Sequence, residues 1–363
     1  MWTTSALLDE LRRLVALPSH EDPTPVLTYL QQRLPFLPWQ QVPVDTAPTG
    51  RPMFNLYARP EAARVVLNTH VDTVPPLGMR DPFTLHVRDG RAYGRGAVDT
   101  KGLLAALVMA VEAFWHRHSQ IPAAIALTVD EENTSARGSA TLAPYLRGSG
   151  PIIVLEPTQG RVCTRQAGAL EFALEARGRS VHAAEAARGV NPLHLLIRWV
   201  GHVEDELGLP LRVLMLQGGW EHYAVPPRAR LLAEIPVAPG QRWAPIEARI
   251  QRSLGQPPWR GWLTYTRIDA EDPWDFGEHS GTRWLRAAYR AALGHEPETG
   301  IMPSWTDAAN FARHGLPCVV FGFGDLAVAH TDREHIAIAD LERMARVLYQ
   351  LFSILTQNPS ATG

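Results

Sequence analysis

The chain has 363 residues, a length that favours two structural domains over a single core. Its 45% hydrophobic and 20% charged content is typical of a folded protein, and no apolar run approaches the ~20 residues of a membrane helix. A net charge of −2, without a basic cluster interleaved with aromatic residues, argues against nucleic acid or an anionic membrane as a partner.

The first fifteen residues indicate an amphipathic helix and lack the basic start and apolar centre of a signal peptide. We therefore expect a cytoplasmic protein. The two cysteines, Cys163 and Cys318, lie in apolar segments and cannot form a disulfide framework, which favours reduced thiols in the core.

The first part of the chain alternates helical and extended patterns. Apolar residues recur at helical spacing in four segments: 5–17, 24–34, 101–117 and 138–147. Short apolar runs predict strands at 53–59, 64–69, 121–129 and 151–155, with a hairpin closed by Asp89-Gly90. This alternation predicts a mostly parallel sheet with helices on both faces.

From about Leu170 a second pattern begins, with the order strand, helix, strand, strand, helix, strand. The six segments are 171–178, 190–207, 211–219, 228–237, 245–254 and 261–268. This order is typical of a small α+β unit of the split βαβ kind. The α/β pattern then returns at 281–293, 306–314, 317–323 and 336–356, so we expect one domain interrupted by another, with 269–278 as the return linker.

Acidic and imidazole side chains follow the ends of the predicted strands. They are His70, Asp72, Asp99, Glu131, Glu132, Glu156 and His330. Because the carboxyl ends of parallel strands meet at one edge of a sheet, these groups could converge despite their separation in sequence.

Converging carboxylates repel one another unless a cation is present. Two histidines with several carboxylates suit zinc, cobalt or manganese, and one carboxylate can bridge two ions. Each residue alone also has an ordinary interpretation: Asp99 could cap the helix at 101–117, and His330 could be a simple loop histidine. No G-x-S-x-G or H-E-x-x-H motif offers a different hydrolytic chemistry.

Six segments resemble, in order, the motifs of one enzyme family. They are "HVDTVP", "GRGAVDTKG", "DEENTSARGS", "LEPT", "GRSVHAA" and "AHTDREHI". The family is that of acetylornithine deacetylase and succinyl-diaminopimelate desuccinylase, which are dinuclear zinc amidohydrolases; it also includes aminoacylases, acetylcitrulline and acetyl-lysine deacetylases, dipeptidases and glutamate carboxypeptidases. The resemblance covers essentially the whole chain.

The resemblance implies a zinc-exopeptidase-like α/β catalytic domain formed by residues 1–166 and 271–363. Residues 167–270 would form an inserted lid, through which such proteins commonly form homodimers. His182 of the lid would reach the partner subunit's active site and stabilise the oxyanion of the reaction.

The resemblance also assigns roles in binding two divalent ions, for which we expect zinc, with cobalt or manganese as alternatives. Asp99 would bridge the two ions, and Asp72 would orient the imidazole of His70. The remaining ligands would be His70 and Glu156 at the first ion and Glu132 and His330 at the second. Glu131 would be the general base that activates water.

The lid departs from the pattern of many relatives. Tyr223 stands where they carry an asparagine, and Pro236 stands where they carry an arginine. In the relatives, that asparagine and that arginine help to hold the substrate carboxylate. Proline has neither charge nor N–H and cannot substitute. Carboxylate recognition would therefore pass to Arg228 or Arg230, or be absent.

The stretches "SWTDAANF" and "FGFGDLAVAHT" resemble the acetylornithine, acetylcitrulline and acetyl-lysine deacetylases more than the peptidases. Ser304, Thr306 and Asp307 are therefore candidates for contacting the substrate, although Asp307 could equally cap the helix at 306–314. We expect an enzyme that removes the acyl group from an N-acyl-amino acid in arginine or lysine metabolism. The alternatives are a dipeptidase or carboxypeptidase of the same family, and a non-catalytic protein that binds amino acids or peptides.

Overall fold

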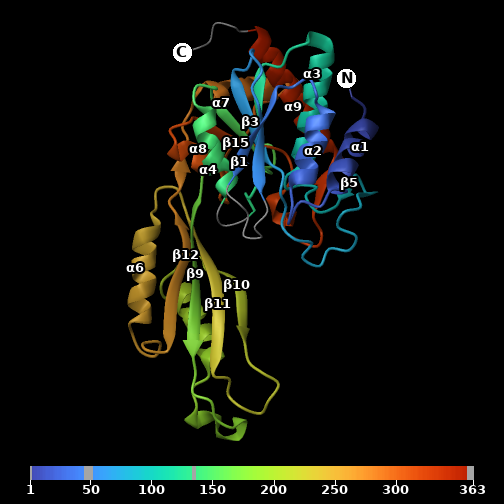
Figure 1. The fold of residues 1–363 in the computed structure, drawn as a ribbon. Coiled ribbons are helices and arrows are strands. Elements are labelled where there is room, and N and C mark those ends of the chain that lie inside the picture. The colour runs from blue at the N-terminus through green and yellow to red at the C-terminus, as the bar shows by residue number, and fades with distance from the viewer. Residues whose placement is uncertain (1, 45–51, 133–135, 358–363) are drawn as a thin grey trace. The chain divides into compact units, whose positions relative to one another are not determined.

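The structure is a computed structural model that describes residues 2–44, 52–132 and 136–357. The chain divides into two compact units (Figure 1). The first unit consists of 1–165, 276–302 and 306–363, and the second, called the insert below, of 166–275 with 303–305. In the described ranges, no helix combines the length and the apolar character needed to cross a membrane.

The first unit is built on a sheet whose described strands follow the order β1-β2-β6-β3-β7-β15-β8-β13, with β14 beside β8; of these, β13 falls within residues 166–275. Its central strands β6, β3, β7 and β15 are parallel to one another, whereas β1 and β2 pair antiparallel at one end. The strand bounds are β1 Trp39–Val44, β2 Met53–Ala58, β3 Val65–His70, β6 Ala123–Thr128, β7 Ile152–Leu155, β8 Val162–Gln166, β13 Trp274–Asp275, β14 Thr299–Met302 and β15 Cys318–Phe321.

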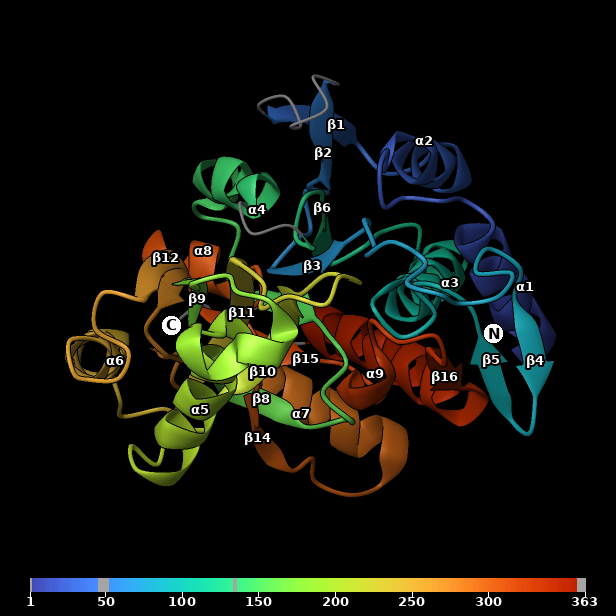
Figure 2. The same ribbon diagram turned by 90° about the horizontal axis from the view of Figure 1, so that it is seen from below.

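The four central strands are buried along their whole length, because helices cover both faces of the sheet. On one face lie α1 Thr4–Val15, α2 Thr24–Arg33, α3 Lys101–His118, α7 Ser280–Leu293 and α9 Ile338–Gln357. On the other lie α4 Arg137–Leu142 and α8 Ala308–Arg313, as Figure 2 shows from below. This architecture confirms the predicted α/β class with a mostly parallel central sheet.

A small second sheet in this unit contains the predicted hairpin. Strands β4 His86–Arg88 and β5 Arg91–Tyr93 are joined at Asp89 and Gly90, both with positive φ, which suits a two-residue hairpin turn. A third strand, β16 His335–Ala337, pairs with β5 and was not predicted. It follows directly on the loop that carries His330.

The insert has an antiparallel sheet in the order β10-β11-β9-β12. Its elements are β9 Gly168–Arg177, η2 Ala183–Arg188, α5 Pro192–Asp205, β10 Arg212–Gly218, β11 Arg228–Val237, α6 Trp243–Leu254 and β12 Leu263–Glu271. A separate apolar core, with Phe172 and Trp199 packed edge to face, joins the two helices to one face of this sheet. The split βαβ order is therefore confirmed.

One predicted helix has different bounds in the structure, and one strand was not predicted. The helix predicted at 138–147 ends as α4 at Leu142 and continues as the 3₁₀ turn η1 Ala143–Leu146, because Pro144 has no N–H to continue α-helical bonding. The edge strand β1 was not predicted, since its polar residues and Pro43 hide the extended pattern. A further 3₁₀ turn, η3 Leu326–Val328, follows β15.

Candidate metal centre

The predicted ligands come together at the carboxyl ends of the central strands. His70 is the last residue of β3, and Glu156 follows β7 directly. Asp99 lies two residues before α3, which begins at Lys101. The side chain of Asp99 does not cap that helix; it faces His70 instead, which removes the ordinary interpretation of this aspartate.

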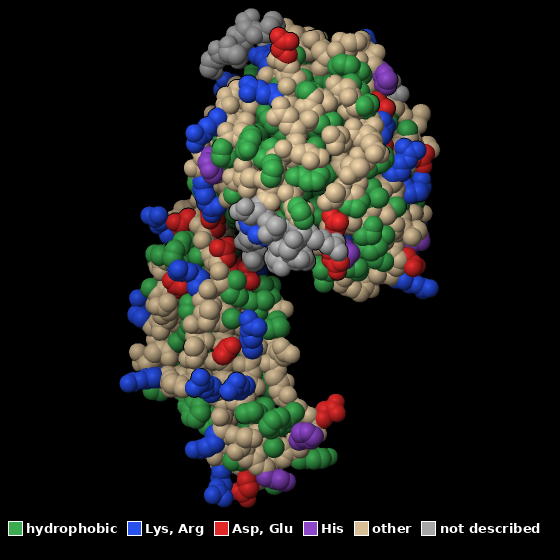
Figure 3. All heavy atoms as spheres, in the orientation of Figure 1, with side chains coloured by type: hydrophobic (Ala, Val, Ile, Leu, Met, Phe, Trp, Pro, Cys, Tyr) green, Lys and Arg blue, Asp and Glu red, His purple; other side chains and the backbone are tan. Residues whose placement is uncertain are grey.

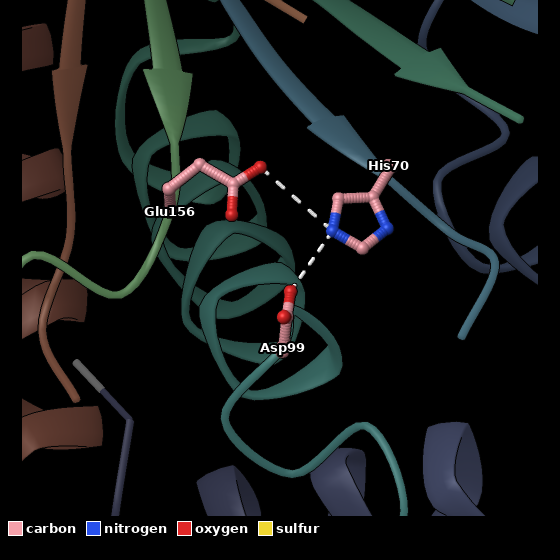
Figure 4. A group of neighbouring side chains, drawn as sticks. All are labelled: His70, Asp99 and Glu156. Atoms are coloured by element: carbon pink, nitrogen blue, oxygen red, sulfur yellow. Dashed lines mark hydrogen bonds and ion pairs between the residues drawn. The ribbon is translucent and has the colours of Figure 1, made fainter. Parts of the chain in front are cut away.

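The first cluster consists of His70, Asp99 and Glu156 (Figure 4). His70 Nε2 lies 3.0 Å from Asp99 Oδ1 and 3.7 Å from Glu156 Oε1. One ligand atom from each residue falls within 4.8 Å of the others, and all three residues are buried. The three side chains point toward one another from separate elements, so a single ion could be bound by all of them.

The second cluster shares Asp99 and adds Glu132 and His330. His330 Nε2 lies 2.9 Å from Glu132 Oε2 and 3.4 Å from Asp99 Oδ2. The two oxygens of Asp99 therefore face different clusters. This is the arrangement that a carboxylate bridging two ions requires.

Asp72 links the two clusters through the backbone. Its carbonyl oxygen lies 3.1 Å from His70 Nδ1, nearer than its carboxylate at 3.7 Å, and its Oδ2 accepts a hydrogen bond from Glu132 N. With Nδ1 donating to that carbonyl, Nε2 is the nitrogen that faces Asp99 and Glu156, and its lone pair could bind an ion once its proton is displaced. Asp72 thus contacts the imidazole by its main-chain carbonyl, with its carboxylate only at ion-pair distance.

Glu131 belongs to neither cluster, although its Oε2 lies 4.0 Å from His70 Nε2. Burial raises the pKa of Glu131 well above the ordinary value of a glutamate, His70 opposes the change, and neighbouring carboxylates add to it. A buried carboxylate beside the clusters, rather than within them, remains available for proton transfer.

The pKa values of the residues in the clusters are shifted because several carboxyl groups are buried close together. Burial raises the pKa of Glu132 and, more strongly, of Glu156. At Asp99 burial favours the neutral acid, yet the two imidazoles outweigh it and hold its pKa below the ordinary value. Hydrogen bonds with Asp99 and Glu132 raise the pKa of His330 to about 10. Imidazolium protons therefore compensate the carboxylates, and divalent cations could replace them.

The residues present fit such ions. Glu132 Oε1 and Glu156 Oε1 are buried and have no hydrogen-bond partner among the described residues. An orphaned buried oxygen is costly, and coordination to a cation would satisfy it. Imidazole nitrogens and carboxylate oxygens form a donor set that zinc, cobalt and manganese accept.

The residues predicted to contact the substrate do not form one cluster, unlike the predicted metal ligands. Asp307 is buried near the clusters, where its Oδ2 accepts a hydrogen bond from Thr128 Oγ1 at 2.6 Å, and burial raises its pKa to about 6. It occupies the N-cap position of α8 but makes no side-chain hydrogen bond to the helix, so its carboxylate does not cap α8. Thr306 is also buried and accepts a hydrogen bond from Ala308 N, whereas Ser304 is exposed and belongs to the insert.

The remaining predicted residues lie in the insert. His182 precedes η2 and lines a hollow of about 710 Å³ with Arg179 and Arg188 among others. Arg228 and Arg230 are exposed on β11. Figure 3 shows basic side chains spread over the visible face of the insert.

Sequence reasoning gave no role to Arg95 or Glu334, which form a fully buried ion pair beside the clusters. Both residues lie inside motifs that carry a candidate ligand, Arg95 four residues before Asp99 and Glu334 four residues after His330. A charged residue four positions from a candidate ligand, present in both motifs, is the signal in the sequence that points to them.

Comparison with known proteins places this geometry in a family. Residues 66–353 match the profile of peptidase family M20/M25/M40. An acetylornithine deacetylase of Myxococcus xanthus is 29% identical over 95% of this chain and 96% of its own length. A succinyl-diaminopimelate desuccinylase of Xylella fastidiosa is 29% identical over 79% of this chain and 82% of its own.

The fold also matches solved structures. Human carnosine dipeptidase 1 superposes with a TM-score of 0.82 at 17% identity, covering 98% of this chain and 96% of that one. At that identity the likeness shows the fold alone. Together with the profile match, it confirms the resemblance found in the motifs: the chain belongs to peptidase family M20/M25/M40 and is a hydrolase that acts on amide bonds.

Proposed function

We propose that the protein is a metal-dependent amidohydrolase that removes the acyl group from an N-acyl-amino acid. The observation that carries the proposal is Asp99, whose two oxygens face the His70–Glu156 pair and the Glu132–His330 pair. The relative named acetylornithine deacetylase, which spans nearly the whole chain, supports an N-acetyl-amino acid as substrate. A cytoplasmic location and a place in arginine or lysine metabolism are part of the same proposal.

Five residues would hold two divalent ions, zinc in the first instance and cobalt or manganese as alternatives: His70, Asp99, Glu132, Glu156 and His330. Bound there, the ions would lower the pKa of a water molecule and polarise the substrate carbonyl. The remaining steps fall to side chains of the protein.

Glu131 is proposed as the general base. Its carboxylate would take a proton from the attacking water and deliver it to the departing amine, so the same oxygen acts first as base and then as acid. Its position outside both clusters supports this role, because a carboxylate coordinated to a divalent ion is a much weaker base than one that is not coordinated.

His182 is proposed to stabilise the oxyanion in the partner subunit's active site. Its Nδ1 accepts a hydrogen bond from Ala184 N, so the neutral imidazole carries its proton on Nε2. Since the residue is exposed, that N–H can donate to a substrate oxygen.

A homodimer through the insert would bring this histidine to a second copy. Strand β10 is an edge of the insert's sheet, and it exposes Val213, Leu214 and Leu216. Ile197 of α5 is also 55% exposed. An open strand edge with apolar side chains is suited to pairing with the same edge of another copy about a two-fold axis.

The register of the insert's sheet favours Arg228 over Arg230 as the group that holds the substrate carboxylate. Arg228 lies directly opposite Arg177 on β9, whereas Arg230 lies opposite Glu175. Two exposed guanidinium groups side by side repel each other and would be relieved by an anion, while Arg230 already faces a carboxylate. Ser304, Thr306 and Asp307 remain proposed substrate contacts, with Asp307 as the partner of a cationic side chain.

The proposal is tested by amine release from metal-loaded protein on a panel of N-acetyl-ornithine, -citrulline, -lysine and -glutamate, succinyl-diaminopimelate and several dipeptides. Preference for one acetylated amino acid would support the deacetylase. Hydrolysis of dipeptides alone would favour a dipeptidase, as the name of the human structural neighbour suggests for that protein.

A further inference from the structure

Arg95 and Glu334 form an ion pair that neither cluster of candidate ligands contains. Arg95 Nη1 lies 2.5 Å from Glu334 Oε2, and each side chain is 1% exposed. The residues are 239 positions apart in sequence. Burying two charges costs free energy that their mutual attraction offsets only in good geometry, so such a pair is weak evidence for stability and invites a functional explanation.

Glu334 holds the segment that carries Asp99. Its Oε1 accepts hydrogen bonds from Val98 N at 3.1 Å and from Asp99 N at 3.2 Å. Its backbone carbonyl accepts a further bond from Gly94 N at 3.3 Å. One glutamate therefore binds both ends of the segment 94–99, which ends at the aspartate whose two oxygens face the clusters.

Arg95 extends the connection to two other loops. Its Nη2 donates to the carbonyl of Thr331 at 3.2 Å and to that of Pro76 at 2.8 Å. Thr331 follows His330, and Pro76 belongs to the loop that begins after His70. The buried pair thus joins three loops, each of which carries or follows a candidate ligand.

His330 depends on such support more than His70 does. His70 is fully buried at the end of a central strand, whereas the side chain of His330 is 49% exposed and comes from a loop. The backbone of His330 has φ of 60°, a conformation that residues other than glycine adopt when surrounding structure holds them there. The bond from Arg95 to the next carbonyl is one such constraint.

We propose that Arg95 and Glu334 are positioning residues that fix the separation of Asp99 and His330 and so preorganise the second cluster for its ion. This role rests on the proposed metal-dependent function. The first cluster is held by the strand ends of β3 and β7, so the pair acts mainly on the site formed by Asp99, Glu132 and His330.

A purely structural role would destabilise the fold without changing one site selectively. Glu10 offers a matched control for that case. It is 1% exposed in α1, lies 3.0 Å from Arg33 Nε, accepts a hydrogen bond from Tyr29, and is bonded to no candidate ligand. Glu10→Gln and Glu334→Gln therefore each remove one buried negative charge, in different places.

The test is a titration of metal-free full-length protein with Co²⁺, followed by the visible absorption bands of the bound ion and by thermal unfolding of each variant. We expect Glu334→Gln to raise the dissociation constant of the second Co²⁺ by about 10–100-fold and to alter its absorption spectrum, while the first constant, for a site that shares Asp99 but is otherwise held by strand ends, rises less. We expect Glu10→Gln to lower the unfolding temperature and leave both constants unchanged.

Arg95→Lys provides a second variant if Glu334→Gln does not fold. Lysine keeps the charge but lacks the planar fork that reaches Glu334, Thr331 and Pro76 together, so a smaller increase in the same constant is expected. Wild-type constants and spectra in a folded Glu334→Gln or Arg95→Lys would overturn the positioning role alone. A wild-type protein that binds no Co²⁺ would overturn the metal centre, and the positioning role with it.

Discussion

Asp99 and His70 meet through a single carboxylate oxygen, Oδ1, at 3.0 Å from Nε2, and the other oxygen of Asp99 is left to face His330. This division of one carboxylate between two imidazoles is the basis of the two-ion proposal. We expect Asp99→Asn to reduce the metal bound after dialysis at both clusters, because the amide has only one oxygen and no charge. Metal analysis beside wild-type protein measures this; full wild-type occupancy would argue against a bridging aspartate.

Glu131 and Glu132 are adjacent but should give opposite results on substitution. Glu131 lies outside both clusters, so Glu131→Gln should retain the bound metal and lower kcat by about 10²–10⁴-fold, the usual contribution of a general base. Glu132→Gln is the control and should lose metal at the second cluster. Near-wild-type turnover of metal-loaded Glu131→Gln would exclude it as the base.

Arg228 and Arg230 should differ in their effect on substrate binding, because they face different residues of β9: Arg228 faces Arg177 and Arg230 faces Glu175. Arg228→Met should raise KM by about 10–100-fold with little change in kcat, since it removes a charge-assisted bond to the substrate carboxylate. Arg230→Met is the matched control and should change KM less. Because Arg228 faces Arg177, its loss should also not destabilise the insert. Equal kinetics for both variants and wild type would remove the two arginines from substrate recognition.

Edge strand β10 should be the dimer contact. Replacing Leu214 and Leu216 together by glutamate should give a monomer by light scattering, with a circular dichroism spectrum unchanged and kcat reduced because His182 no longer reaches a partner. Ile268→Glu is the control, since this residue is 42% exposed on β12, the opposite edge of the same sheet. A dimer that persists in the double variant and dissociates in the control would place the contact elsewhere.

Arg33 connects α1, α2 and α3 through Glu10 and Glu112. Arg33→Met should lower the free energy of unfolding by about 2 kcal/mol, less than the ~3–5 kcal/mol of a fully buried pair because Arg33 and Glu112 are partly exposed. Denaturant unfolding measures the change.

The ion pair of Arg33 with Glu112 makes the free energy of unfolding depend on pH, with a sign that follows from the pKa shift. The hydrogen bond from Arg33 lowers the pKa of Glu112 below its ordinary 4.5. A depressed folded-state pKa stabilises the fold above the unfolded value, and that contribution is lost as pH falls below about 4.5 toward the folded value. The difference in unfolding free energy between wild type and Arg33→Met should therefore shrink on acidification; a difference independent of pH would contradict the pairing.

Much of the site could be predicted because its residues follow strand ends. His70 and Glu156 were visible as polar residues directly after apolar runs, and the topology of parallel strands brings such positions together. The hairpin at Asp89-Gly90 was visible because its turn requires residues that tolerate positive φ.

Other features depend on contacts that no local pattern encodes. The pairing of Arg95 with Glu334 joins residues 239 positions apart, and each alone looks like an exposed loop charge. Asp307 was a candidate both for a substrate contact and for a helix cap; its burial and its hydrogen bond with Thr128, on a strand far earlier in the chain, are not visible in the local sequence. The direction of each oxygen of Asp99 likewise depends on the contacts among the loops that carry Pro76, Asp99 and Thr331. The spacing of residues in the sequence could not predict it.

The most direct test of the central proposal compares zinc-loaded protein with protein treated with a chelator, measuring amine release from N-acetyl-ornithine and the other acetylated amino acids together with metal content. We expect the loaded protein to approach two ions per chain and to hydrolyse at least one of these substrates, with activity lost on chelation and restored by zinc or cobalt. Absence of bound metal, or hydrolysis that survives its complete removal, would contradict a two-ion amidohydrolase.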